Sequence, residues 1–263
     1  MIRLTREVRF AINGPADPQL GGRATNGYAG FPALVGFGPW MSLQVTLSGP
    51  LDPVSNYLIN IKQIDTTVRE LAIPRIAEAV LDGRTTPPQL MARLDAALAA
   101  WPPLMLEELK LNLSPFTSLS IRAPERPMMR LSQTFEFSAT HRLHNPKATD
   151  AENRHIFGKC NNPHGHGHNY EVQVTLLGEP DATGLLIEIP EFERIVAATV
   201  IDRFDHKNLN VEVPEFRELI PTVENIAMTT YRLLKPKFAK KSAKLASVTV
   251  WETPKTWCEY SEE

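Results

Sequence analysis

The chain has 263 residues, of which 43% are hydrophobic and 22% are charged, and its formal net charge is −2. This length suits one large domain or two of about 130 residues, each with a packed core. The mild negative charge and the absence of a basic tract argue against nucleic acid as a partner, and no apolar stretch is long enough to span a membrane.

The first half of the chain contains strand patterns followed by helical patterns. Residues 3–11 and 43–49 alternate apolar and polar side chains, as half-buried strands do. Residues 61–81 and 87–101 carry the apolar rhythm of helices. Glycine, threonine and proline between these two segments predict a break in the helix.

The second half repeats this order. We expect strands at residues 130–138 and 172–178, and helices at 190–202 and 222–235, with Thr222 as the cap of the last helix. Each half therefore predicts an antiparallel sheet with helices on one face, which places the chain in the α+β class.

Four segments of the first half recur in the second in the same order, at offsets of 127 to 129 residues. Residues 43–49 match 172–178, and residues 118–121 match 247–250. A fixed offset is the signature of a duplicated unit. We therefore expect two tandem units, residues 1–126 and residues 127–263.

The two units differ in the residues that carry chemistry. All seven histidines lie between His141 and His206, so the first unit has none. At the positions of His141, His166, His168, Cys160 and Glu252 the first unit has Gly14, Phe37, Pro39, Phe31 and Ala123. The first unit is therefore expected to be a degenerate copy that lacks metal ligands.

The histidines of the second unit predict a metal site. His166 and His168 flank one glycine at the start of an expected strand, so both side chains point to the same face. His141 ends the preceding strand and offers a third imidazole. Three histidines with one open position are typical of catalytic zinc, whereas structural zinc is closed by four protein ligands. Cys160 lies six residues before the pair and supplies a thiol nearby.

The second unit resembles the 6-pyruvoyltetrahydropterin synthase family over residues 134–260. The motifs that carry the resemblance stand in the family's order at residues 137–141, 160–170, 204–209, 222–225 and 251–253. Five residues separate Cys160 from His166, as in the biopterin-pathway enzymes, whereas the related 6-carboxytetrahydropterin synthases usually have three. The resemblance implies the tunnelling fold (T-fold), in which sheets from several subunits join into a barrel.

The resemblance also implies roles for individual residues. The zinc ligands would be His141, His166 and His168, the proton-transfer residues Cys160, Asp205 and His206, and the pterin-binding residues Glu252, Thr222 and Glu224. In the family the Asp-His pair comes from a neighbouring subunit. We therefore expect a homo-oligomer in which catalytic units contact each other.

The implied reaction converts 7,8-dihydroneopterin triphosphate to 6-pyruvoyltetrahydropterin with loss of triphosphate. It would use Zn²⁺, with Mg²⁺ as a further candidate ion for the triphosphate. One alternative is a 6-carboxytetrahydropterin synthase of the queuosine pathway, and another is a non-catalytic pterin-binding protein, suggested by the degenerate copy. Cys160, Asp205, His206 and Glu252 together argue against the second alternative.

Simpler explanations exist for several of these residues. Thr222 and Glu224 are types that favour any helix start. Asp205 and His206 would point apart if their segment is extended. His144, His155 and His164 are expected in solvated loops.

We also expect a cytoplasmic location. The chain opens without an apolar signal core. Its two cysteines, Cys160 and Cys258, lie in different contexts and suggest no disulfide framework, which fits a reducing compartment.

Overall fold

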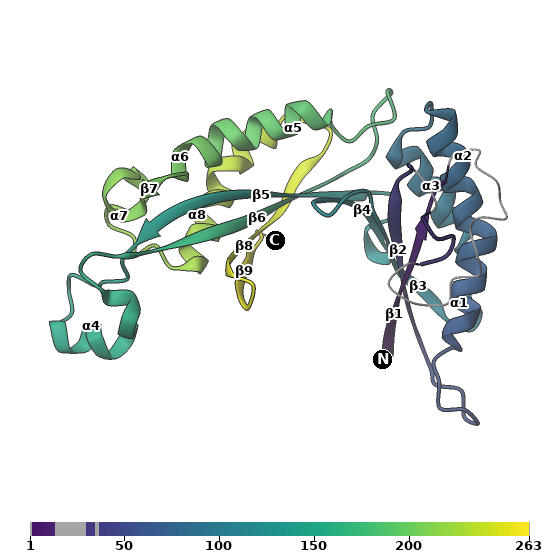
Figure 1. The fold of residues 1–263 in the computed structure, drawn as a ribbon, viewed down its shortest axis with the longest axis horizontal. Helices are drawn as coiled ribbons and strands as arrows, with labels where there is room; N and C mark the ends of the chain where they lie inside the picture. The colour runs from purple at the N-terminus through teal and green to yellow at the C-terminus, as the bar shows by residue number, and fades with distance from the viewer. Residues whose placement is uncertain (1, 14–29, 35–36, 263) are drawn as a thin grey trace. The chain divides into compact units, whose positions relative to one another are not determined.

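The structure is a computed structural model that describes residues 2–13, 30–34 and 37–262 (Figure 1). Its contacts divide the chain into two units. Unit 1 comprises Met1–Leu131 with Gly178–Leu186, and unit 2 comprises Ser132–Leu177 with Ile187–Glu263. Among the helices so described, none has both the length and the apolar character needed to cross a bilayer.

Unit 1 contains an antiparallel sheet in the order β1-β2-β3-β4 and a group of helices. Its strands are β1 (Ile2–Ala11), β2 (Trp40–Gly49), β3 (Met105–Asn112) and β4 (Thr117–Arg122). Its helical segments are α1 (Ile61–Thr67), η2 (Val68–Ala72), α2 (Ile73–Asp82), α3 (Pro87–Ala97) and η3 (Ala123–Glu125). Val8, Phe10, Leu43, Val45 and Leu47 alternate along β1 and β2 and are buried, as the period-two pattern predicts.

Unit 2 contains the sheet order β5-β6-β8-β9, with the short β7 paired in parallel to β5. Its strands are β5 (Met129–His141), β6 (His166–Gly178), β7 (Lys207–Asn208), β8 (Lys244–Thr253) and β9 (Thr256–Tyr260). Its helical segments are α4 (Asp150–Phe157), η4 (Gly158–Asn161), α5 (Ile189–Val196), η5 (Ala197–Ile201), α6 (Asp202–Phe204), α7 (Leu209–Glu212), η6 (Pro214–Phe216) and α8 (Val223–Phe238).

The core of unit 2 lies between the sheet and α8, which packs against β8 and β9. Val172 and Val174 of β6 and Val248 and Val250 of β8 are fully buried. Because side chains alternate along a strand, the next residues of this face continue it beyond the apolar core. His166 and His168 of β6 and Glu252 of β8 have the same parity as these valines and therefore belong to the same face of the sheet. Helix α8 lies beside β8 and β9 (Figure 1).

The expected α+β class and the antiparallel sheets with helices on one face are confirmed. The expected helix at residues 61–81 is the continuous run α1-η2-α2, and that at 190–202 is α5-η5-α6. The expected helix at 222–235 is α8, and Thr222 caps it by accepting a hydrogen bond from the backbone N–H of Asn225.

The helix α4 was not predicted. Thr149 and Glu152 form a reciprocal capping box at the start of α4. The Thr149 side chain accepts a hydrogen bond from the backbone N–H of Glu152, and the Glu152 side chain accepts one from the backbone N–H of Thr149. His155, which was expected in a loop, therefore lies on a helix and is exposed.

The two units share irregularities at equivalent positions. A π-helical turn begins at Val68 in unit 1 and at Ala197 in unit 2. The register between neighbouring strands shifts after Thr46 in unit 1 and after Thr175 in unit 2. Both pairs are 129 residues apart. These features support the duplication proposed from sequence, which remains a prediction together with its boundaries. Gly14, which it aligns with His141, lies outside the described residues.

The fourth sequence match, between residues 118–121 and 247–250, is wrong. β8 pairs with β6 as β3, not β4, pairs with β2. β4 pairs with β3 as β9 pairs with β8. By this register, Leu113 rather than Ala123 takes the place of Glu252. Neither residue has a carboxylate, so unit 1 still lacks this group.

Candidate metal centre

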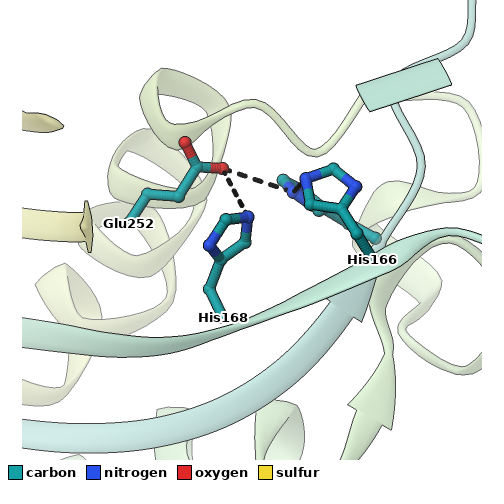
Figure 2. A group of neighbouring side chains, drawn as sticks. His166, His168 and Glu252 are labelled. Carbon is teal, nitrogen blue, oxygen red and sulfur yellow. Dashed lines mark hydrogen bonds and ion pairs between the residues drawn. The ribbon is translucent and has the colours of Figure 1, made fainter. Parts of the chain in front are cut away.

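Three strands each contribute polar side chains to one cluster in unit 2. His141 ends β5 on the face that also carries the buried Phe137 and Ala139. His166 and His168 begin β6 on the face that continues into the buried Tyr170. Within the described ranges, His141, His166, His168 and Glu252 form the one group whose ligand atoms all lie within 4.8 Å of one another (Figure 2).

A tight turn brings the histidine pair of β6 next to the end of β5. The Gly165 N–H donates to the Asn162 carbonyl (2.8 Å), which closes the turn immediately before β6. Gly165 has φ +73°, and a Cβ atom there would lie 3.0 Å from the His141 carbonyl oxygen. Glycine therefore allows both the left-handed backbone and the close approach to β5.

Register brings Glu252 to the histidines. Glu171 of β6 pairs with Trp251 of β8, so Glu252 follows directly on the neighbouring strand. One carboxylate oxygen of Glu252, Oε1, lies 3.3 Å from His141 Nε2 and 3.5 Å from His168 Nε2. The Glu252 side chain is 20% exposed, whereas that of His141 is fully buried.

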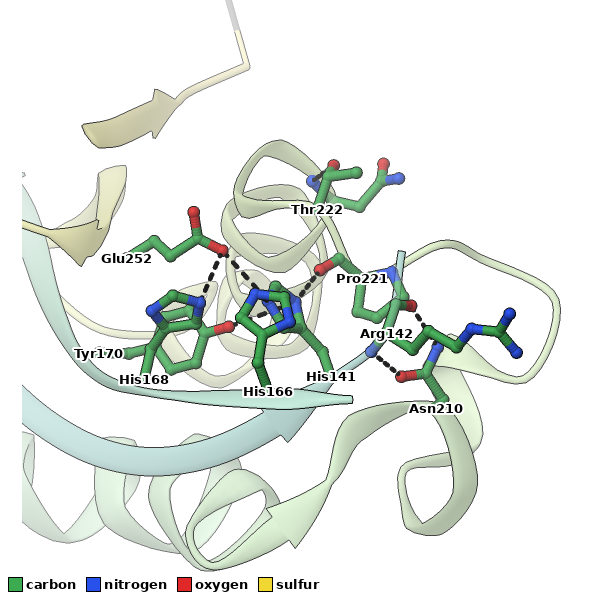
Figure 3. A network of polar contacts seen from close by, with 10 residues as sticks. His141, Arg142, His166, His168, Tyr170, Asn210, Pro221, Thr222 and Glu252 are labelled. Atoms are coloured by element: carbon green, nitrogen blue, oxygen red, sulfur yellow. Dashed lines mark hydrogen bonds and ion pairs between the residues drawn. The ribbon is translucent and has the colours of Figure 1, made fainter. Parts of the chain in front are cut away.

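A backbone carbonyl holds the His141 ring in place (Figure 3). Its Nδ1 lies 2.7 Å from the carbonyl oxygen of Pro221, directly before the cap of α8. A carbonyl only accepts, so Nδ1 carries the proton and donates it. The unprotonated Nε2 then faces His166 Nε2 at 3.1 Å. This is the arrangement in which a metal-binding histidine is oriented by a backbone carbonyl.

Two further residues support His141. The Tyr170 hydroxyl lies 3.4 Å from His141 Nδ1. The Asn210 side chain accepts from the Arg142 N–H (2.7 Å) and donates to the Arg142 carbonyl (2.9 Å), which fixes the chain directly after His141. Neither residue was predicted from the sequence, although Tyr170 continues the i, i+2 spacing of His166 and His168.

The electrostatics favour a cation. Burial, followed by the nearby His141, lowers the pKa of His166, and burial also lowers the pKa of His168. The neighbouring His141, and then His168, lower the pKa of the Glu252 carboxyl. At neutral pH the cluster therefore presents neutral His166 and His168 rings and a Glu252 carboxylate, the protonation states that a metal requires.

His168 Nε2, a buried ring nitrogen that lies 3.5 Å from the Glu252 carboxylate, has no hydrogen-bond partner. Buried polar atoms are rarely left unpaired. A donor set of imidazole nitrogens and one carboxylate oxygen suits zinc. The residues present thus fit a metal ion.

Cys160 is close to this cluster without belonging to it. It lies on η4, and its carbonyl accepts from the Leu143 N–H (2.9 Å), two residues past His141. Burial raises the pKa of Tyr170, and the negative charges of Glu252 and then of Cys160 raise it further. Cys160 therefore lies near enough to Tyr170 to affect it electrostatically.

Asp205 and His206 point toward each other, contrary to the expectation for an extended pair. His206 has φ +56°, which turns its ring back so that Nδ1 lies 2.7 Å from Asp205 Oδ2. The other oxygen, Oδ1, accepts from the Ser138 N–H (2.8 Å). This bond, followed by that of His206, lowers the pKa of Asp205.

The His206 side chain is 83% exposed. Its ring and that of His168 line the same open pocket, which has a volume of about 530 Å³. The pair therefore lies at the surface beside the cluster.

The proposed pterin-binding residues are not all together. Glu252 lies in the cluster, Thr222 caps α8, and Glu224 is exposed in the first turn of that helix. The helix start accounts for Thr222 and Glu224 without a ligand. Of the histidines expected in loops, His144 is half-buried and bonds to Asn161, and His164 is exposed.

An antiparallel sheet with helices on one face and a histidine cluster at its strand ends defines a tunnelling-fold protein with a candidate metal centre. The model of the 6-pyruvoyl tetrahydropterin synthase family matches residues 130–263. The chain belongs to this family.

The chain is similar to individual proteins with related names. The chain is 41% identical to the 6-pyruvoyl tetrahydrobiopterin synthase of Drosophila melanogaster over 137 residues, which are 52% of this chain and 81% of that protein. The solved structure of the Caenorhabditis elegans 6-pyruvoyl tetrahydropterin synthase is 39% identical and has a TM-score of 0.49; the match covers 52% of this chain and 97% of that one. The 6-carboxy-5,6,7,8-tetrahydropterin synthase of Haemophilus influenzae is 27% identical over 156 residues, covering 51% of this chain and all of that protein.

Proposed function

We propose that this protein is a zinc-dependent lyase that converts 7,8-dihydroneopterin triphosphate to 6-pyruvoyltetrahydropterin with loss of triphosphate. The observation that carries the proposal is the convergence of His141, His166 and His168 in a chain of this family. The name of the Drosophila relative, at 41% identity, supports the same reaction.

The three histidines would hold the zinc ion. When bound, zinc supplies Lewis acidity toward the oxygens of the substrate's three-carbon side chain, which makes the neighbouring C–H bonds more acidic. The Pro221 carbonyl keeps His141 in the tautomer that this ligation needs.

Cys160 would act as the general base that removes a proton from the side chain. A thiolate serves near neutral pH when positive charge lies close. Cys160 lies on η4, and its carbonyl accepts a hydrogen bond from the N–H of Leu143, two residues after His141. This position next to the histidine cluster supports the role.

Asp205 and His206 would form the second proton-transfer group. Asp205 holds Nδ1 of His206 through a 2.7 Å contact and leaves Nε2 free to take or give a proton. The exposure of His206 would let it serve either its own chain or a neighbour.

Glu252 would bind the pterin ring, because the 2-aminopyrimidinone edge offers two parallel N–H donors to one carboxylate. Thr222 and Glu224 would line the pterin pocket from the start of α8. We further propose a cytoplasmic homo-oligomer with its catalytic units in contact, and Mg²⁺ as a candidate partner of the triphosphate.

A product assay tests the reaction. Purified protein is incubated with 7,8-dihydroneopterin triphosphate and Zn²⁺, and the products are identified by mass. We expect 6-pyruvoyltetrahydropterin and triphosphate, and no turnover after chelation or in His168→Asn. Release of 6-carboxytetrahydropterin would instead favour the alternative, to which the identity of 27% with the Haemophilus protein gives weaker support. Binding without any product would leave a pterin-binding protein.

A further inference from the structure

A carboxylate completes the histidine cluster at the position where a zinc enzyme is expected to be open. Glu252 Oε1 approaches two of the three imidazoles, His141 and His168, at 3.3 and 3.5 Å. Figure 2 shows this oxygen directed at the rings. From the sequence, Glu252 was expected to bind the pterin ring alone.

These contacts bring three donor atoms together at one point. His141 Nδ1 donates to the Pro221 carbonyl, so its other ring nitrogen, Nε2, is the atom directed at the cluster. That nitrogen faces both the Glu252 carboxylate and His166 Nε2. A single cation between these atoms would bind all three.

The separations that involve Glu252 suit a metal ligand. Zinc–nitrogen and zinc–carboxylate distances of about 2.0 to 2.1 Å give a tetrahedron with edges of about 3.3 Å. Glu252 Oε1 lies 3.3 and 3.5 Å from two imidazole nitrogens, and the two ring nitrogens of His141 and His166 lie 3.1 Å apart. All four donor atoms lie within 4.8 Å of one another. Glu252 therefore lies at the distance of a fellow ligand from two of the histidines in the cluster.

We propose that Glu252 is the fourth metal ligand in the substrate-free enzyme and leaves the metal to hold the pterin ring when substrate binds. This inference rests on the proposed function, since it takes the pterin as the competing partner of the carboxylate. A Glu252 oxygen that accepts a hydrogen bond from an N–H of the pterin ring is no longer available to the metal. The same side chain would therefore close the metal site in the resting enzyme and open it when substrate binds.

The position of Glu252 permits this exchange. It lies near the end of β8, one residue before the strand ends at Thr253, and its side chain is partly exposed. The histidines lie on the longer strands β5 and β6, and His141 is held by the α8 start. The carboxylate is therefore the ligand with the greatest freedom to move.

Metal titration tests the resting state without any turnover. Metal-free wild type, Glu252→Gln and the control Glu259→Gln are titrated with Co²⁺, and affinity and the visible spectrum are recorded. Glu259 is an exposed carboxylate on β9 outside the cluster. We expect Glu252→Gln to bind Co²⁺ at least about tenfold more weakly and with a changed spectrum, and the control to match wild type.

A second variant excludes a folding defect. In Glu252→Ala, added acetate should restore the wild-type Co²⁺ spectrum, because acetate supplies the missing carboxylate, whereas chloride at equal ionic strength should not. Wild-type affinity and spectrum in Glu252→Gln, or an Ala variant insensitive to acetate, would overturn the proposal.

The exchange itself is tested with unsubstituted pterin, which has the ring but no side-chain oxygens that could bind the metal. Pterin should change the Co²⁺ spectrum of wild type toward that of Glu252→Gln, and leave the spectrum of that variant unchanged. If pterin binds and the wild-type spectrum stays constant, Glu252 does not exchange, although the proposed reaction stands. Failure of wild type to bind any metal would instead remove the proposed function as well.

Discussion

At the scale of single residues, the candidate metal ligands are separate from Cys160, the residue that we propose as the proton-transfer base. The four converging side chains come from three strands, and Cys160 comes from a separate 3₁₀ turn. Nothing in the cluster requires the sulfur as a ligand. Chemistry and metal affinity should therefore be separable by mutation.

We predict that Cys160→Ser keeps its full complement of zinc but loses activity by a factor on the order of 10² to 10⁴, the usual contribution of a general base. Metal content by atomic emission and turnover by product mass check the two effects. A variant that loses zinc and activity in parallel would mean that the sulfur is a ligand. Cys258→Ser, on β9, is the matched control and should change neither.

At the scale of elements, the start of α8 serves two purposes. Thr222 caps the helix, and the Pro221 carbonyl directly before it orients His141. Sequence motifs of the family alone would assign Thr222 to the pterin pocket. Stability measurements can distinguish the two roles.

We predict that Thr222→Ala lowers the free energy of unfolding by about 1 kcal/mol, because the Asn225 N–H loses its acceptor. Thr222→Ser retains a hydroxyl and should unfold within a few tenths of a kcal/mol of wild type. Urea unfolding of the metal-free proteins measures both. An unchanged midpoint in the Ala variant together with a raised KM would favour the pocket role instead.

At the scale of the whole molecule, the open question is how complete sites assemble from tandem units. Unit 1 contributes no histidine, and the described part of the chain has one metal-binding group, in unit 2. The surface pair Asp205–His206 is available to a second catalytic unit. Barrel assembly itself remains a prediction.

Complementation tests this prediction. Cys160→Ser and His206→Ala chains, each inactive alone, are co-expressed and purified as mixed oligomers. If one chain's thiol works with another chain's His206, random pairing restores about a quarter of the sites. Sites formed within one chain would give no recovery. Mixing Cys160→Ser with the Cys160→Ser/His206→Ala double variant provides the inactive control.

The sequence by itself determined the local features of this protein. Period-two alternation located β1, β2, β5 and β6, and helical rhythm located the long helices, because backbone geometry fixes both repeats. His166 and His168 were assigned to one face for the same reason. The α4 helix was not predicted because its apolar face is short, although Thr149 and Glu152 have the spacing of a capping box.

Only the tertiary structure decided which of these features meet. Glu252 joins the histidines because β8 pairs with β6 in the register that sets Trp251 opposite Glu171. The tautomer of His141 depends on a carbonyl 80 residues away in the chain. The wrong match between residues 118–121 and 247–250 also arose because only local sequence was compared. Short strand sequences resemble each other, and only the order of hydrogen-bonded strands in the sheet distinguishes them. Pairing across long sequence separations is set by packing of the whole sheet, which no local pattern encodes.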